Sequence, residues 1–157
     1  MDHQLHIALY EPEIPQNTGN IGRLCLGLGA QLHLIHPLGF QIDEKAVRRA
    51  GLDYWKHVSL REHASFAEFM DWVGQRKVFA LSTKSTASAW DVTFGPGDVL
   101  LMGPETRGLP LDVREATIPI RIPMTGHIRS LNLANATAIV AYQAISQINP
   151  SWFSVAD

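Results

Sequence analysis

The stretch from Asn17 to Arg23 is the first of three segments whose residue types suit a binding site. Gly19 and Gly22 lack side chains, so a ligand or another backbone can approach the start of a helix closely there. Arg23 is expected to project from that helix one turn after its start. The same residues also fit an ordinary capped helix with a surface arginine, and the segment alone leaves both interpretations open.

The second segment, Gly103 to Pro110, directly follows the apolar run 99–102. A glycine at the end of a strand leaves backbone groups bare for a ligand. Glu105 offers hydrogen-bond acceptors to the hydroxyls of a ribose or to an amine. A plain turn from strand to helix is the alternative interpretation.

The third segment consists of Ile122 to Met124 and Ser130 to Ala136. Ser130 is a good residue for capping a helix, which would be a purely structural role. Asn132 and Asn135 weaken a helix interior, so their presence indicates a specific contact. Hydroxyl and amide groups of this kind can orient a polar substrate.

Several familiar chemical motifs are absent from the sequence. It contains no G-x-G-x-x-G after the first apolar run, no phosphate-binding G-x-x-x-x-G-K-[ST] and no H-E-x-x-H. The seven histidines have no metal-ligand spacing, and the single cysteine, Cys25, lies among leucines as a core residue would. These absences argue against a dinucleotide oxidoreductase, a phosphotransferase of the P-loop type and a zinc enzyme, and no metal is expected.

Apolar runs alternate with amphipathic ones, which indicates an α/β fold with a mostly parallel sheet flanked by helices. Asn17 or Thr18 should cap the first helix, after two prolines that keep residues 11–15 out of a regular helix. In such sheets ligands bind beyond the carboxyl ends of the strands, where segments 11–23, 103–110 and 122–132 fall. The expected strands are 5–10, 31–36, 55–60, 77–82, 99–102 and 116–122, and the expected helices are 17–30, 43–50, 65–73 and 131–148.

The last of these helices is expected to pack through one face and to allow close packing between subunits. The face comprises Ala134, Ala138, Ile139, Tyr142 and Ile145.

The length of 157 residues predicts one domain, 1–157, and 46% hydrophobic with 18% charged residues is ordinary globular composition. One cysteine, no signal peptide and no long apolar run together predict a cytoplasmic protein without a membrane span. The net charge of −2 argues mildly against broad contact with nucleic acid. An RNA partner would require basic residues to gather on one face, although solvated surface charges are the more usual interpretation. The candidates are Lys45, Arg48, Arg49, Lys56, Arg107 and Arg129.

Taken together and in this order, the three segments resemble the SPOUT class of RNA methyltransferases. Within that class the chain is similar to the bacterial tRNA (cytidine/uridine) 2′-O-methyltransferases that act on the wobble nucleotide of the anticodon, and the resemblance covers nearly the whole chain. The narrower similarity rests on residues 9–15, 48–54 and 79–84.

The resemblance implies a fold, a cofactor and a partner. The fold is an α/β domain whose C-terminal half is threaded into a trefoil knot, a topology that periodicity could never have indicated. The cofactor is S-adenosylmethionine and the partner is tRNA, with no metal required. By resemblance the cofactor-binding residues are Leu81, Gly103, Ile122, Met124, Ser130 and Leu131.

The resemblance also assigns a catalytic role to Arg23. In the family this arginine is sometimes taken to be the general base. A guanidinium with a pKa above about 12 hardly loses a proton, so we favour a clamp that binds the adjacent phosphate and lowers the pKa of the ribose hydroxyl. Asn17, Ser130 and Asn132 would then orient the ribose.

A chain this short is expected to form a homodimer whose second subunit completes the RNA surface. Two alternatives stay open: methylation of another RNA such as ribosomal RNA, and a non-catalytic knotted module that only binds RNA. The sequence does not name the tRNAs that are read, nor an earlier modification that they require.

Overall fold

The fold is built around β1 (Leu5–Tyr10), the third of six strands across the sheet. Its neighbours are β2 (Gln31–Ile35) and β5 (Asp98–Met102), and every strand pairing is parallel. The order β3-β2-β1-β5-β4-β6 is completed by β3 (Leu60–His63), β4 (Val78–Leu81) and β6 (Ile118–Ile120). The computed structural model describes residues 2–42, 45, 49 and 52–154.

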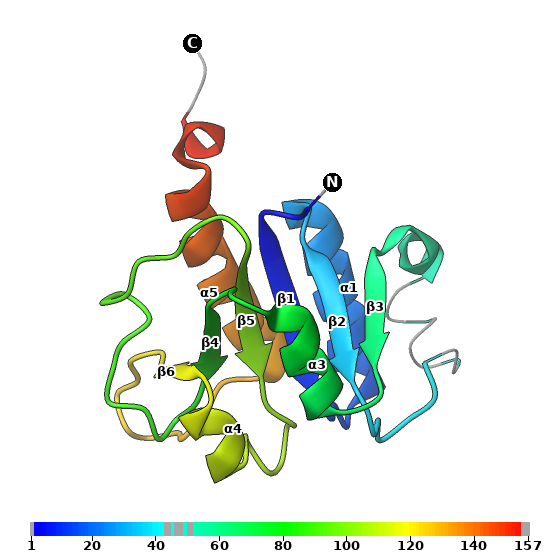
Figure 1. The fold of residues 1–157 in the computed structure, drawn as a ribbon, viewed down its shortest axis with the longest axis horizontal. Helices are drawn as coiled ribbons and strands as arrows, with labels where there is room; N and C mark the ends of the chain where they lie inside the picture. Colours follow the sequence, from blue (N-terminus) through cyan, green and yellow to red (C-terminus); the bar gives the residue numbers. More distant parts are fainter. Residues whose placement is uncertain (1, 43–44, 46–48, 50–51, 155–157) are drawn as a thin grey trace.

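Helices cover both faces of this sheet (Figure 1). On one face, α1 (Pro15–Leu28) and α5 (Leu133–Ile148) bury residues such as Ile21 and Val140 against the strands. On the other face lie α3 (Phe66–Val73) and α4 (Leu111–Glu115). The α/β fold with a parallel sheet is therefore confirmed. Among the described residues, the remaining elements are the 3-10 helices η1 (Leu52–His57) and η2 (Pro150–Phe153).

Helix α1 begins earlier than the sequence indicated. Ile14 is its N-cap and Pro15 its first residue, a position that proline favours because no amide hydrogen is needed there. Asn17 and Thr18 lie inside the helix and are buried, so the prediction that one of them caps it was wrong. Cys25 is confirmed as a core residue, and burial raises the pKa of its thiol to about 12.

Helix α5 also differs from expectation at its start and on its packing face. Its N-cap is Asn132, whose side-chain oxygen accepts hydrogen bonds from the backbone of Ala134 and Asn135, so Ser130 does not cap it. The predicted inward residues Ile139 and Tyr142 are exposed. Ile145 of the predicted face is buried, and Ala134 packs partly buried against the core. The other side chains that pack inward are Ala136, Thr137, Val140, Ala141 and Ala144.

Three further expectations have different outcomes. Residues 55–60 do not form the predicted strand, because η1 occupies the first half of this stretch and β3 starts only at Leu60. The predicted basic helix at 43–50 falls largely on residues that the structure does not describe. The amphipathic helix is confirmed as α3, and the hydroxyl of Ser65 accepts the backbone N–H of Glu68 at its start.

A chain of three buried histidines crosses strands β1, β2 and β3 under α3. Nδ1 of His6 lies 3.0 Å from Nε2 of His33, and Nδ1 of His33 lies 2.9 Å from Nε2 of His63. Burial lowers the pKa of His6 to about 4 and that of His33 to about 2, and it also lowers the pKa of His63. All three imidazoles are therefore neutral in the folded protein near neutral pH.

These lowered pKa values predict a loss of stability in acid. Below pH 6.5 the unfolded chain binds protons at these histidines while the folded chain does not, so unfolding becomes more favourable as the pH falls. Between pH 6.5 and about 4, His6 and His33 should each lower the free energy of unfolding by up to about 1.4 kcal/mol per pH unit. Urea unfolding of His33→Gln should show a shallower decline over this range, whereas the exposed-site variant His127→Gln should match the wild type. Identical slopes for all three proteins would contradict the assignment.

Candidate active site at the carboxyl end of the sheet

A pocket of about 770 Å³ opens where the loops after β4, β5 and β6 meet the start of α5. This volume lies within the range of small-molecule sites. Ile14 and Asn17 add the start of α1 to its wall, so all three segments singled out from the sequence meet here. The six residues expected to bind cofactor all line the pocket: Leu81, Gly103, Ile122, Met124, Ser130 and Leu131.

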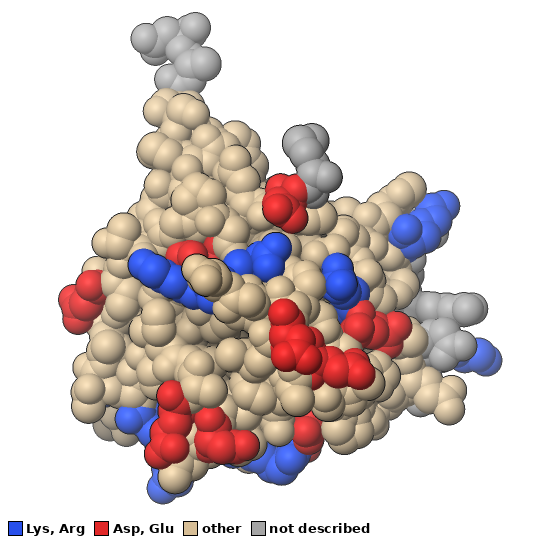
Figure 2. All heavy atoms as spheres, in the orientation of Figure 1, with Lys and Arg blue, Asp and Glu red and all other residues tan. Residues whose placement is uncertain are grey.

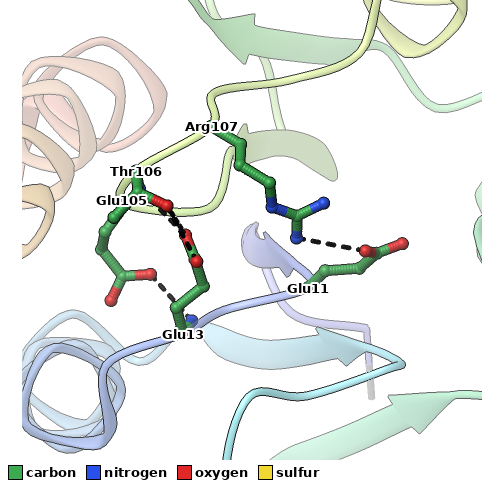
Figure 3. Close-up of polar contacts among 5 residues, drawn as sticks. All are labelled: Glu11, Glu13, Glu105, Thr106 and Arg107. Carbon is green, nitrogen blue, oxygen red and sulfur yellow. Dashed lines mark hydrogen bonds and ion pairs between the residues drawn. The ribbon is translucent and has the colours of Figure 1, made fainter.

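The carboxylate of Glu105 fastens the loop after β5 to the start of α1. One oxygen accepts the backbone N–H of Glu13 at 2.9 Å (Figure 3). The other accepts the backbone N–H of Ile14 at 2.8 Å and the side-chain amide of Asn17 at 3.1 Å. A negative charge at a helix N-terminus is also favoured by the helix dipole. The expected role of Glu105 as an acceptor for a ligand is therefore replaced by a structural one.

Asn17 also connects this part of the site to the start of α5. Its side-chain oxygen accepts a hydrogen bond from Nδ2 of Asn132 at 3.2 Å. Asn132 in turn caps α5, which explains why an asparagine is found at this position. Glu105, Asn17 and Asn132 thus form one line of hydrogen bonds across the pocket wall, which we call the Glu-Asn-Asn line.

A second set of contacts supports the same loop (Figure 3). The carboxylate of Glu13 accepts hydrogen bonds from the backbone N–H and the hydroxyl of Thr106, each at 2.9 Å, and these bonds lower its pKa. Arg107 lies 3.3 Å from the carboxylate of Glu11. No local sequence pattern indicates these pairs, because 93 and 96 positions separate their members.

Gly103 is required by the loop rather than by open space in the pocket. A Cβ atom built on it would lie 2.8 Å from the backbone nitrogen of Leu109. The turn is closed by Gly108, at a φ of 70°, which donates its N–H to the oxygen of Pro104. A side chain at position 103 would therefore push away the segment that forms the pocket wall.

The pocket combines apolar walls with a cationic rim. Met102 and Ile122 are buried at its base, while Leu131 and Leu133 are half-buried. The rim carries four cationic side chains, Lys84, Arg107, Arg121 and Arg129. Apolar surface suits the face of a nucleobase, and the cations suit phosphate groups. Of the four, only Arg107 and Arg129 were among the candidates for RNA contact that the sequence offered.

Arg23 is the expected site residue that the structure does not bring to this pocket. Six residues separate it from Asn17 along α1, about 9 Å along the helix axis and about 240° around it. Its side chain is exposed, and the guanidinium carbon lies 5.2 Å from the centre of the Tyr54 ring. Arg23 lies more than two turns into α1, so the expectation of one turn was wrong.

Two kinds of site are not found among the described residues. No group of three or more His, Cys, Asp or Glu side chains in this part of the chain is arranged to hold a metal ion. None of the helices that the structure describes is both long enough and apolar enough to span a membrane.

Comparison with known proteins gives consistent results. Residues 4–142 match the model of the SpoU rRNA Methylase family. The chain is 48% identical to the tRNA (cytidine(34)-2'-O)-methyltransferase of Escherichia coli strain K12 over 147 residues, which is 92% of this chain and 94% of that protein.

Two solved structures share the fold. One, described as giving insights into the 2-OH methylation of C/U34 on tRNA, has a TM-score of 0.90 and 51% identity, covering 92% of this chain and 96% of the other. A SpoU methyltransferase from Streptomyces viridochromogenes in complex with the cofactor AdoMet has a TM-score of 0.83 and 27% identity. That match covers 94% of this chain and 59% of the other.

The role of Glu105 can be tested by an isosteric change. Glu105→Gln replaces one acceptor oxygen with an NH₂ group that must face other N–H donors, so the free energy of unfolding should fall by about 1–3 kcal/mol. Urea unfolding monitored by circular dichroism measures this loss. Glu115→Gln, at an exposed position of α4, serves as the control and should be neutral. Equal stability of the two variants would show that Glu105 does not fasten the loop.

Proposed function

Because the chain belongs to the SpoU rRNA methylase family, we propose that it transfers a methyl group from S-adenosylmethionine to the ribose 2′-hydroxyl of a tRNA wobble nucleotide. The observation that carries this proposal is the pocket, in which all six expected cofactor residues lie beside Asn17 and Asn132. Cytidine 34 as the substrate follows the E. coli relative, which matches nearly from end to end, and uridine 34 follows the solved structure described for methylation of C/U34. Methylation of ribosomal RNA is less well supported, because it is named by the family description and by a structural relative at 27% identity, whereas the E. coli relative at 48% identity is named for tRNA.

The pocket fits the cofactor in size and in the kind of groups that it offers. The half-buried side chains of Leu81 and Leu131 and the buried Ile122 give apolar surface for an adenine ring, and the backbone around Gly103 gives hydrogen-bonding groups for its edge. When bound, S-adenosylmethionine supplies an electrophilic methyl group. Holding donor and acceptor in line removes much of the barrier, on the order of 7–11 kcal/mol in favourable cases.

In this proposal, Asn17 and Asn132 orient the ribose. Each uses one side-chain N–H inside the Glu-Asn-Asn line, and a primary amide has a second N–H to donate. Because the line fixes both side chains, these donors are held ready before the substrate arrives. Ser130 is exposed on the pocket wall and can add a hydroxyl.

Arg23 acts, in this proposal, as a clamp on the phosphate next to the reacting ribose. Its positive charge lowers the pKa of the 2′-hydroxyl, and the proton leaves to phosphate or water, because a guanidinium is too weak a base to take it. Because Arg23 lies outside the pocket of its own subunit, a second subunit supplies it in this proposal.

The outer surface of α1 and α5 supports such a homodimer. Leu26, Ile139 and Tyr142 are 37%, 40% and 43% exposed on these two neighbouring helices. Leu26 follows Arg23 by three residues, so both project from a similar side of α1. Burying this apolar face against a second copy would bring Arg23 to the subunit interface.

Charge is the remaining requirement for an RNA partner. On the face shown in Figure 2, Lys and Arg side chains are interspersed with Asp and Glu side chains rather than gathered into a patch. The cations on the pocket rim, Lys84, Arg107, Arg121 and Arg129, are therefore our candidates for contacts with tRNA phosphates. We place this activity in the cytoplasm, and the knotted threading of the C-terminal half stays a prediction.

Arg23→Ala tests the clamp. Single-turnover methylation of tRNA, followed by mass spectrometry with labelled cofactor, should slow by several orders of magnitude, while calorimetry should give an unchanged cofactor affinity. Arg23→Lys keeps the charge but loses the bidentate geometry, so it should retain part of the rate. Methylation by Arg23→Ala at the wild-type rate would refute the role of Arg23. Absence of any cofactor binding by the wild type would favour the non-catalytic alternative.

Mixing two impaired variants tests whether the site is shared between subunits. Asn132→Asp keeps a good helix cap but loses the N–H that Asn17 accepts, so it should damage the pocket without unfolding α5. If the pocket of one subunit works with Arg23 of the other, a co-refolded mixture of Arg23→Ala and Asn132→Asp contains dimers with one intact site. The mixture should then be more active than the sum of the separate variants. No gain on mixing would place the whole site within one subunit.

A further inference from the structure

The turn that follows the undescribed residues of segment 43–51 packs directly against α1 beside Arg23. A Cβ atom built on Gly22 would lie 2.5 Å from Cζ3 and 3.0 Å from Cε3 of Trp55, and 3.4 Å from Cγ2 of Val58. These ring atoms belong to a bulky side chain in η1 that cannot bend out of the way. Glycine at position 22 is therefore required for η1 to lie this close to the helix.

Glycine is otherwise a poor choice in the middle of a helix, because it loses more backbone freedom on folding than alanine. Its presence one residue before Arg23 indicates that the approach of η1 matters at this point. This approach also brings together the residue that follows Gly22 and the residue that precedes Trp55. Tyr54, which precedes Trp55, lies with its ring 5.2 Å from the guanidinium carbon of Arg23.

The contact with the Tyr54 ring does not use the N–H donors of the Arg23 guanidinium. Among the residues that the structure describes, no carboxylate lies within ion-pair distance of Arg23 and no hydrogen bond to its guanidinium is found. A guanidinium that lies over an aromatic ring is held through its face, and the N–H groups at its edge can still donate.

We propose that Tyr54 is a positioning residue, whose ring holds the Arg23 guanidinium oriented toward the RNA phosphate. This inference rests on the proposed role of Arg23 as a clamp. A free arginine side chain loses considerable rotamer freedom when it binds a phosphate, and a ring that already restrains it reduces that loss. The orientation of Arg23 thus depends on three residues. Gly22 leaves room for Trp55, and the position of Trp55 brings the neighbouring Tyr54 beside Arg23.

The test compares Tyr54→Phe, which keeps the ring, with Tyr54→Leu, which keeps only apolar bulk. Single-turnover methylation of tRNA at saturating cofactor should slow on the order of tenfold in Tyr54→Leu and stay near the wild-type rate in Tyr54→Phe. Cofactor affinity, measured by calorimetry, should not change in either variant. In an Arg23→Ala background, Tyr54→Leu should cause no further loss, because the residue through which it acts is gone.

Arg61→Ala is the matched control. It also removes an arginine that lies over an aromatic ring, 5.9 Å from Trp72, but on the side of the sheet covered by α3. Its methylation rate should equal that of the wild type. Gly22→Ala should slow methylation as Tyr54→Leu does, because it displaces η1. Circular dichroism is the check that this variant is folded.

The outcomes separate this inference from the proposed function. If Tyr54→Phe is as slow as Tyr54→Leu, the hydroxyl rather than the ring is needed and the inference is wrong. It is also wrong if Tyr54→Leu is as fast as the wild type while Arg23→Ala is slow, or if Tyr54→Leu slows the Arg23→Ala enzyme further. If Arg23→Ala itself methylates normally, the role of Arg23 fails first, and the inference falls with it.

Discussion

The Glu105 carboxylate and the two asparagine amides connected to it are the interaction on which the rest of the site depends. Glu105 and Asn17 are 88 positions apart in the chain, and Asn17 and Asn132 are 115 positions apart. Backbone pairing in the sheet brings these segments to the carboxyl end of the strands. The side-chain hydrogen bonds then fix how the two loops and the two helix starts meet. Each buried or half-buried polar group in the line has a partner, so the wall can be both polar and rigid.

The same line explains why the pocket forms at this end of the sheet. β1 and β5 are adjacent and parallel, so the loops that follow them leave the sheet side by side. Glu105 satisfies backbone N–H groups at the start of α1, and Asn132 satisfies those at the start of α5. Two helix starts and one loop therefore share a single set of hydrogen bonds, which positions the asparagine donors beside an apolar pocket.

Much of the fold was predictable because it follows from local patterns. The apolar runs gave β1, β4 and β5, and the polar-apolar period gave α3. The site was identified by a resemblance, and the structure brings eight of its nine residues to one pocket. Local sequence patterns led to wrong predictions where contacts between residues far apart in the chain determine the structure. Asn17 is a link between loops rather than a cap, and the contact of Tyr54 with Arg23 depends on the packing of η1 against Gly22.

Crystals grown with S-adenosylhomocysteine test most directly whether the pocket organised by Glu105, Asn17 and Asn132 holds the methyl donor. Difference density for the nucleoside should lie between the loop that starts at Gly103 and the residues around Leu131. The hydrogen bonds among the three side chains should be unchanged, because the site is formed in advance. Density in the separate hollow beside His3 and Trp152, or loss of the contact between Asn17 and Asn132 on binding, would contradict this account.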